Sequence, residues 1–391
     1  MLNGQSRIRL LDILRGFAIL GTLGTNIWLF AYLGDLSYVL TYDHSRWWAS
    51  SDDFIRLLVL FLVNGKFLGL LTIMFGVGLE LKYRQALRHG SPWPGMYIWI
   101  SLILLLEGLV HFTLVMEYDI LMSYAFTAII VSFIVKRGDQ AIKRALKWVG
   151  GFHLLLVSLI LLVSVLIYLS GGTLALGSMG HTIALYQHGS WLEQLLYRIN
   201  HFWILRSEAI FVLPMNVFLF LSGVLLMRAG AFSPDQHGKR IRRKLLAVGM
   251  YVGIPLNLLI FVPGGIFDLP VRYLFAPILS LGYMALIAFI FEKSKHLWIW
   301  GRLEDIGRMA LSCYVLQNIL ASIIFYGWGF GLGGSVNSLT VVTIWLLISV
   351  LLASFATVWH HFFSLGPMET ARKYLAGLPR RSIKHVSKDL S

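Results

Sequence analysis

Hydrophobic residues in this chain occur in ten long runs, and polar or charged residues separate each run from the next. Each run is close to the roughly 20 residues that a helix needs to cross about 30 Å of hydrocarbon. We therefore predict an all-α membrane protein in which residues 1–391 form a single polytopic transmembrane domain. The predicted spans lie near residues 10–33, 57–81, 97–115, 119–135, 148–170, 208–229, 245–262, 271–292, 306–328 and 339–363.

Lysine and arginine are distributed unevenly between the loops that join these spans. Of the 33 Lys and Arg residues, 26 fall on one predicted side, 5 fall on the other, and Arg15 and Lys66 lie within spans. Cytoplasmic loops of membrane proteins carry such an excess of positive charge. The charge pattern therefore predicts about ten spans with both termini in the cytoplasm.

Composition narrows the choice of partners. Apolar residues make up 57% of the chain and charged residues 13%, against about 25% charged in soluble proteins, so the lipid bilayer is a partner. The net charge of +14 lies mostly in the predicted cytoplasmic loops, where anionic lipid attracts it, so we expect no nucleic acid. Cys313 is the only cysteine, which excludes an intrachain disulfide and a thiolate zinc site, and we expect no metal. The oligomeric state is left open, a homodimer included.

A long predicted loop on the outer side covers residues 171–207. The stretch from Trp191 to Ile204 has the pattern of a helix that lies at the membrane interface. Substrate contacts are one interpretation of this extracytoplasmic loop, because loops often carry function. An ordinary solvated loop is the interpretation that we favour from composition.

Two ionisable side chains of opposite charge are predicted at a similar depth in the membrane. Each such group costs roughly 2.5 to 3.5 kcal/mol to insert, which makes it a candidate for function. With a rise of 1.5 Å per residue, Lys66 in the second span and Glu107 in the third lie roughly 12 to 14 Å below the outer surface. We expect the two to pair. A structural ion pair is one interpretation, and substrate binding by Lys66 with a catalytic role for Glu107 is the other.

A histidine follows Glu107 by one helical turn. His111 therefore lies on the same helix face as Glu107, and Asp119 opens the next span across a short hairpin. Imidazole titrates near neutral pH and can accept a proton from a hydroxyl or amine nucleophile. We interpret His111 as a catalytic base. Asp119 either orients the imidazole or only caps the fourth helix, and the sequence does not separate these alternatives.

Four amide side chains fall in the middle or outer half of other predicted spans: Asn26, Asn216, Asn257 and Gln317. Together they are consistent with a polar cavity that is entered from outside. Hydrogen bonds between helices, worth about 0.6 to 2 kcal/mol each, are the alternative. We favour this structural interpretation for the three asparagines.

Charged residues also mark the predicted inner surface. Asp12 and Arg15 begin the first span, and Arg308 begins the ninth. Arginine is suited to phosphate, so these residues are candidates for a phosphate site. An Asp at a helix start, followed three residues later by Arg, is more often a structural pair.

The chain resembles the YeiB family of bacterial membrane proteins nearly from end to end. The segments that carry the resemblance are Arg9 to Ala18 with Asn26, Gly65 to Phe67, Phe75 to Gly78, Gly108 to His111, Tyr118 to Leu121, Tyr124 with Ala125, Gly307 to Ser312, Tyr314, Gln317, Tyr326 with Gly327, and Gly366 to Glu369.

That family is similar to the wider set of transmembrane acyltransferases, which includes heparan-alpha-glucosaminide N-acetyltransferase. The resemblance implies acyl-CoA as donor, with acetyl-CoA expected, and a hydroxyl or amine acceptor outside, on a glycan or a small metabolite. His111 would be the base, with Asp119 and Glu107 beside it. Arg15, Arg308 and Asp12 would hold the donor. Lys66, Asn26, Gln317 and Tyr124 would contact substrate, and the protein would lie in the bacterial plasma membrane.

Three functions remain open at this point. An acyltransferase would use His111 to take the acceptor's proton. A transporter of a small polar metabolite would use Lys66, Glu107 and His111 to relay protons or to bind cargo. A scaffold would need none of these groups. Dependence on acyl-CoA separates the first function from the others.

Overall fold

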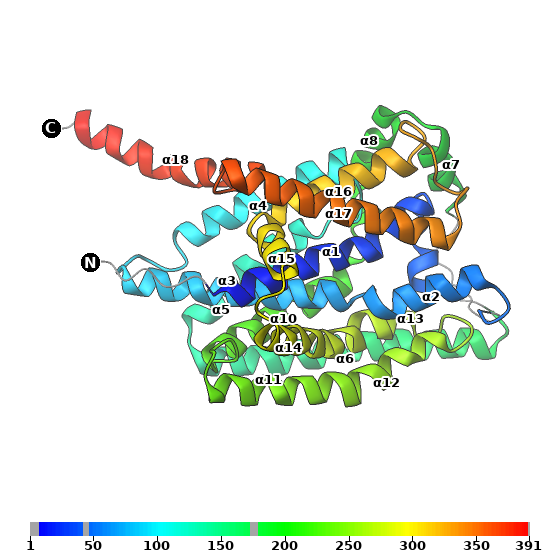
Figure 1. The fold of residues 1–391 in the computed structure, drawn as a ribbon, viewed down its shortest axis with the longest axis horizontal. Coiled ribbons are helices and arrows are strands. Elements are labelled where there is room, and N and C mark those ends of the chain that lie inside the picture. Colours follow the sequence, from blue (N-terminus) through cyan, green and yellow to red (C-terminus); the bar gives the residue numbers. More distant parts are fainter. Residues whose placement is uncertain (1–7, 42–46, 173–178, 390–391) are drawn as a thin grey trace.

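A computed structural model describes residues 8–41, 47–172 and 179–389. Every regular element in these ranges is helical, and most helices run side by side along the long axis of the molecule (Figure 1). The chain is an all-α, multi-pass membrane protein, as the hydrophobic pattern predicts.

The helices of the first half of the chain cover both long spans and short surface segments. They are α1 (Arg9–Ala31), η1 (Ser37–Thr41), α2 (Ser51–Val63), α3 (Lys66–Arg88), α4 (Met96–Leu114), α5 (Leu121–Lys136), α6 (Asp139–Leu169), α7 (Gly180–His188), α8 (Trp191–Asn200) and α9 (Phe202–Leu205).

The second half continues in the same way. Its helices are α10 (Ala209–Arg228), α11 (Gln236–Val248), η2 (Gly249–Gly253), α12 (Ile254–Asn257), η3 (Leu258–Phe261), α13 (Asp268–Pro270), η4 (Val271–Phe275), α14 (Ala276–Lys293), α15 (Ile299–Arg308), α16 (Ala310–Phe325), α17 (Ser338–Phe362) and α18 (Pro367–Asp389).

Each of the ten predicted spans coincides with a helical segment, although two of them differ from a simple crossing. In the described ranges, eight segments are long and apolar enough to cross a membrane, or nine if the bent pair is one span. The pair is α15 and α16, which meet at 91°. The remaining predicted span is α5, an apolar helix of 16 residues. The count of ten therefore depends on α5 and on the bent pair.

The second span is longer than its hydrophobic run suggests. Helices α2 and α3 together form one segment from Ser51 to Arg88, interrupted at Asn64 and Gly65. Gly65 has a φ of 77°, in the left-handed region that glycine tolerates. Because of this interruption, α3 begins inside the molecule, at the fully buried Lys66.

The start of α1 and the whole of α18 lie toward the left of Figure 1. We call this the inner end, because its residues are those that the charge pattern places in the cytoplasm. The opposite end carries α7 and α8 (Figure 1). The predicted interfacial helix at Trp191 to Ile204 corresponds to α8 and α9; residues 173–178 of that loop lie outside the described ranges.

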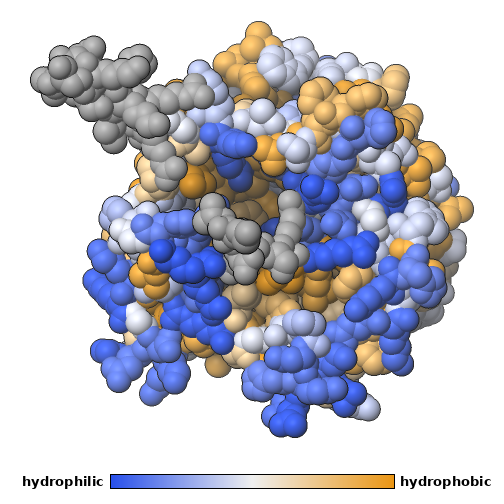
Figure 2. All heavy atoms as spheres, turned by 60° about the vertical axis from the view of Figure 1, so that its left-hand side comes forward, coloured by the Kyte–Doolittle hydropathy of each residue, from blue (hydrophilic) through white to orange (hydrophobic). Residues whose placement is uncertain are grey.

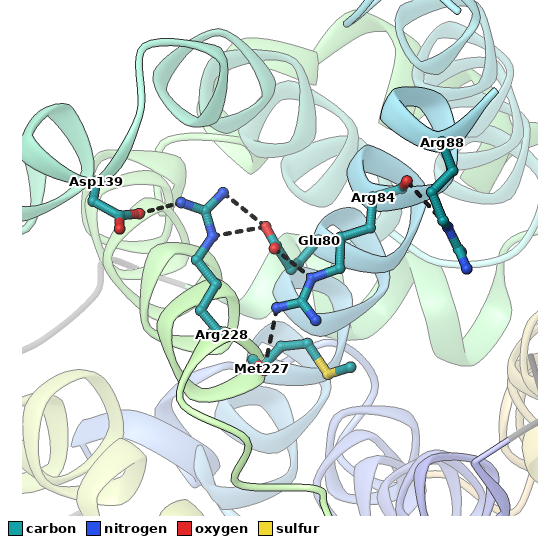
Figure 3. Close-up of polar contacts among 6 residues, drawn as sticks. All are labelled: Glu80, Arg84, Arg88, Asp139, Met227 and Arg228. Carbon is teal, nitrogen blue, oxygen red and sulfur yellow. Dashed lines mark hydrogen bonds and ion pairs between the residues drawn. The ribbon is translucent and has the colours of Figure 1, made fainter. Parts of the chain in front are cut away.

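At the inner end, an ion network ties three helices together. Glu80 of α3 accepts a hydrogen bond from Arg84 Nε at 2.8 Å and bonds from Arg228 Nε and Nη2 at 3.0 and 2.9 Å. Arg228 of α10 also pairs with Asp139, the first residue of α6. The six residues of Figure 3 come from these helix ends. The network fixes the positions of the C-terminal ends of α3 and α10 relative to the start of α6.

Orientation in the membrane follows from the charge pattern and stays a prediction. A reporter fused after Arg137 or after Lys388 is expected to be cytoplasmic, and one inserted in residues 189–191 is expected to be external. Alkaline phosphatase and green fluorescent protein fusions measure this directly. An external reporter after Arg137 would contradict the predicted orientation.

Candidate functional site

The α4–α5 hairpin brings a histidine and an aspartate together inside the protein. His111 near the end of α4 and Asp119 just before α5 are each 3% exposed. His111 Nδ1 lies 3.1 Å from Asp119 Oδ1. Asp119 Oδ2 accepts a hydrogen bond from Met122 N in the first turn of α5 at 2.9 Å. Asp119 thus occupies both positions considered from the sequence, beside the imidazole and at the helix start.

The second imidazole nitrogen is held by an asparagine of α16. Asn318 Nδ2 lies 3.2 Å from His111 Nε2, and Asn318 Oδ1 accepts from Asn26 Nδ2 at 3.3 Å. The amide donates to Nε2, so a neutral imidazole carries its proton on Nδ1, facing Asp119. The hydrogen bonds run in one direction from Asn26 through Asn318 to His111, and the Nδ1 of His111 lies beside Asp119. This leaves Nε2 as the nitrogen with a lone pair available to accept a proton.

The predicted pairing of Lys66 with Glu107 is wrong. Glu107 instead pairs with Arg372 of α18, whose Nε lies 3.0 Å from Glu107 Oε2. Lys66 is fully buried, and its Nζ has no hydrogen-bond partner among the described residues. Equal depth did not make the two helices neighbours, because α5 packs against both α3 and α4. Glu107 therefore faces α18 and does not join His111 and Asp119.

A pocket of about 320 Å³ extends from the inner end toward this histidine, and we call it the inner pocket. Four cationic residues line it: Arg15, Lys82, Arg308 and Arg372. The rest of its wall is mainly apolar. Figure 2 brings the inner end forward and shows hydrophilic residues around a hollow in which hydrophobic surface is visible.

The far wall of the inner pocket is formed by aromatic residues close to His111. Tyr124 and Tyr314 both line the pocket, and the Tyr314 ring centroid lies 5.0 Å from that of His111. Tyr124 is fully buried, with its hydroxyl 3.2 Å from Thr72 Oγ1. The inner pocket thus has charge at one end and aromatic groups beside the imidazole at the other.

Helix α18 completes the wall of the inner pocket. Glu369 lines the pocket and accepts hydrogen bonds from Leu311 N at 2.9 Å and from Ser312 Oγ at 2.5 Å. A carboxylate in this place stabilises the positive end of a helix, here α16. Together with the Arg372–Glu107 pair, these bonds attach α18 to α16 and α4.

A second, smaller pocket lies on the other side of Asp119, and we call it the outer pocket. Its volume is about 50 Å³. Ile120 lines both pockets, so they meet at the hairpin that holds the His111–Asp119 pair. The polar residues in its wall are Thr22, Thr25, Asn26, Asp119, Ser123, Arg206, Glu208 and Arg272.

The other residues selected from the sequence have varied surroundings. Asp12 is buried and lies 3.2 Å from Arg15 Nη1, so this pair has the structural contact that its spacing suggested, while Arg15 also lines the inner pocket. Asn216 accepts from Thr72, and Asn257 donates to Gly253 O and Phe275 O, as expected for bonds between and within helices. Gln317 is fully buried and lines neither pocket.

Sequence reasoning missed several residues around this site. Asn318 was passed over for its neighbour Gln317, although the choice of helix was right. Arg372 was counted with the basic residues of the cytoplasmic side, Glu369 was given no role, and Arg206 belonged to the loop that we interpreted as solvated. For Glu369 a signal was present, since it ends a segment that carries the family resemblance and contacts Ser312 of another such segment.

The outer loop is anchored close to the site. Tyr186 of α7 donates to Glu117 Oε2 at 2.6 Å, and Arg198 of α8 donates to Thr113 O at 2.9 Å. Burial raises the pKa of Glu117, and the nearby Arg198 opposes that rise. These contacts fix α7 and α8 onto the α4–α5 hairpin.

The chain is similar to known proteins over nearly its full length. It is 27% identical to the uncharacterized protein YxaH of Bacillus subtilis, with 93% of each chain covered. It is also 27% identical to the uncharacterized protein YeiB of Escherichia coli, with 92% of this chain and 93% of YeiB covered. The family model described as a protein of unknown function, DUF418, matches residues 226–378. The chain is therefore YeiB-like.

Several of the segments on which we based the family resemblance converge in space. Gly16 and Gly307 lie at the crossing of α1 and α15, beside Arg15 and Arg308 of the inner pocket. Tyr314 forms part of the pocket's far wall, and His111 and Asp119 lie together behind it. In this YeiB-like protein, residues far apart in the sequence thus surround one cavity.

Proposed function

We propose that this protein is a membrane-bound acyltransferase in which His111 is the general base. Acyl-CoA enters the inner pocket from the cytoplasm, and a hydroxyl or amine acceptor approaches from the outer side. The observation that carries the proposal is the inner pocket itself, which has four cationic residues along its wall and ends beside the imidazole. The cations suit the phosphates of coenzyme A, and the apolar part suits its pantetheine arm and acyl group.

The reaction balances with the groups present. The acceptor displaces the Asn318 amide from His111 Nε2. The acceptor's oxygen or nitrogen then attacks the thioester carbonyl, and His111 Nε2 takes the acceptor's proton. The C–S bond then breaks, and the imidazolium gives its proton to the departing thiolate. The products are an ester or amide and free coenzyme A. Asp119 lies beside Nδ1 and stabilises the imidazolium that forms between these steps.

A bacterial plasma membrane is the proposed location, because the relatives named above are bacterial and coenzyme A is cytoplasmic. The inner pocket then opens toward the donor. Transport of a small metabolite is the competing function, and it would need the pockets on the two sides of Ile120 to open in turn. Dependence of product formation on acyl-CoA distinguishes the two functions.

Binding of coenzyme A by the purified protein tests the proposal. Arg15→Gln with Arg308→Gln is expected to weaken binding by at least about 10 to 100-fold, because each hydrogen bond to a charged group contributes about 1.5 to 3 kcal/mol. Isothermal titration calorimetry measures the change. Arg240→Gln, an exposed position of α11, is the control and should bind as the unchanged protein does. If the unchanged protein does not bind coenzyme A and carries solute in proteoliposomes, it is a transporter.

A further inference from the structure

The outer pocket has two arginines and two carboxylates in its wall. Arg206 and Arg272 line it, and Glu208 and Asp119 are the carboxylates in its wall. Lys66 directly follows Gly65, a residue of this wall. It is fully buried, and its Nζ finds no hydrogen-bond partner in the part of the chain that the structure describes. Two arginines therefore face two carboxylates in the wall of the pocket.

Hydrogen bonds hold the two arginines in place, and Glu208 is the carboxylate among their acceptors. Arg206 Nη1 donates to Asp119 O at 2.7 Å and Nη2 donates to Ser123 Oγ at 3.1 Å, both neutral acceptors. Arg272 donates from Nη1 to Asn64 at 2.6 Å and from Nη2 to Glu208 at 3.3 Å. Arg272 is 9% exposed, and its Nε has no hydrogen-bond partner among the described residues.

Three helices also begin at this pocket. Gly65, Ile120 and Glu208 immediately precede α3, α5 and α10, and all three line it. The start of a helix carries about half a positive charge, and its first amide groups attract anions. Asp119 and Glu208 offset part of this charge. The three helix starts thus give a positive potential to a wall in which the two arginines and the two carboxylates balance.

The size of the outer pocket limits what it can hold. One water molecule needs roughly 10 to 15 Å³ of such space, and the pocket offers about 50 Å³. It therefore holds a group of a few heavy atoms and not a whole sugar ring. A carboxylate fits this space, and its two oxygens match the planar donors of a guanidinium group.

We propose that the outer pocket binds a carboxylate of the acyl acceptor, so that the acceptor is an acidic molecule whose hydroxyl or amine reaches His111. The assignment of the carboxylate to the acceptor rests on the proposed acyltransferase function; the anion site itself does not. Arg206 connects the two sites, because it holds the carbonyl of Asp119, the residue that pairs with His111.

The test uses the purified full-length protein with acetate as probe and acetamide as its uncharged counterpart, at constant ionic strength. Acetate is expected to raise the melting temperature, and acetamide is not. Arg206→Gln should weaken the apparent acetate affinity at least about tenfold, since a charge-assisted pair is lost. Arg272→Lys keeps the charge beside Glu208, preserves the fold if Arg272→Gln does not, and should weaken the acetate affinity less than Arg206→Gln does. Arg240→Gln should leave it unchanged.

Several outcomes would overturn the inference. Equal stabilisation by acetamide, or undiminished acetate binding by Arg206→Gln, would mean that there is no anion site. Binding of inorganic phosphate in place of acetate would contradict the carboxylate assignment. Displacement of acetate when phosphatidylglycerol replaces phosphatidylcholine in nanodiscs would assign the site to a lipid headgroup.

The two proposals can fail separately. If acetate binds through Arg206 but coenzyme A does not bind, the anion site stands and the acyltransferase proposal fails. If acyl transfer occurs and Arg206→Gln raises the KM of an acidic acceptor no more than that of its amide, the transferase stands and the acceptor assignment fails.

Discussion

Replacing His111 with Ala is expected to reduce acyl transfer about 100 to 10,000-fold, the usual effect of removing a general base. The side chain lies behind Tyr314 and is not part of the inner pocket wall. Coenzyme A binding should therefore survive while turnover collapses. Single-turnover transfer from labelled acetyl-CoA and calorimetry on the same preparation measure the two effects.

Two further variants separate a base from a structural histidine. Asp119→Asn should reduce the transfer rate, because an amide cannot stabilise the imidazolium. The reduction should be smaller than in His111→Ala, because the base is still present and the amide oxygen can still accept from Met122 N. His153→Ala removes another buried imidazole. His153 lies in α6, and its Nε2 is 2.9 Å from Tyr273 O of η4. A loss of turnover in His153→Ala as large as in His111→Ala would indicate a general packing defect. Near-normal transfer by His111→Ala would exclude the base.

Replacing Gly307 with Ala is expected to destabilise the protein severely. A Cβ at this position would lie 1.8 Å from Asp12 O, and a Cβ at Gly16 would lie 1.9 Å from Leu303 O. Both obstacles are backbone atoms, so no side-chain rotation relieves the overlap, and α1 and α15 must move apart. Overpacking of a dense interior costs about 1 to 3 kcal/mol, and more where backbone must shift.

The loss should include the donor site, because α1 carries Arg15 and α15 carries Arg308. We expect a lower melting temperature and weaker coenzyme A binding together in Gly307→Ala. Gly301→Ala is the matched control on the same helix, since nothing lies within 4 Å of its Cβ position. Helix propensity predicts that this control is stabilised by up to about 1 kcal/mol. Equal melting of the two variants would contradict the close crossing of α1 and α15.

Elements that depend on local sequence could be predicted well. The long apolar runs indicate helices because a bilayer requires them, and α6 and α17 follow directly from length and composition. His111 and Asp119 were expected to meet because only a short hairpin separates them. The break between α15 and α16 was not expected, since Met309 is apolar and continues the hydrophobic run.

Contacts between distant segments were harder to predict. Depth in the membrane says how far along a helix a residue lies but not which helix it faces, so Lys66 was paired with Glu107 across the intervening α5. Arg372 looked like one of many basic residues near the chain end. Its role as the partner of Glu107 depends on α18 packing against α4, which no local pattern indicates.

The position of Ile120 between the two pockets has an electrical consequence. An energised membrane holds a potential of about 2.3 kcal/mol per elementary charge for each 100 mV. A continuous water-filled path through a protein would let ions cross and dissipate this potential. Ile120 contributes an apolar side chain to the wall of both cavities, and a seal at this position would keep the two sides of the membrane electrically insulated from each other. An acyl group is uncharged, so an enzyme of the proposed kind can transfer it past Ile120 without dissipating the membrane potential.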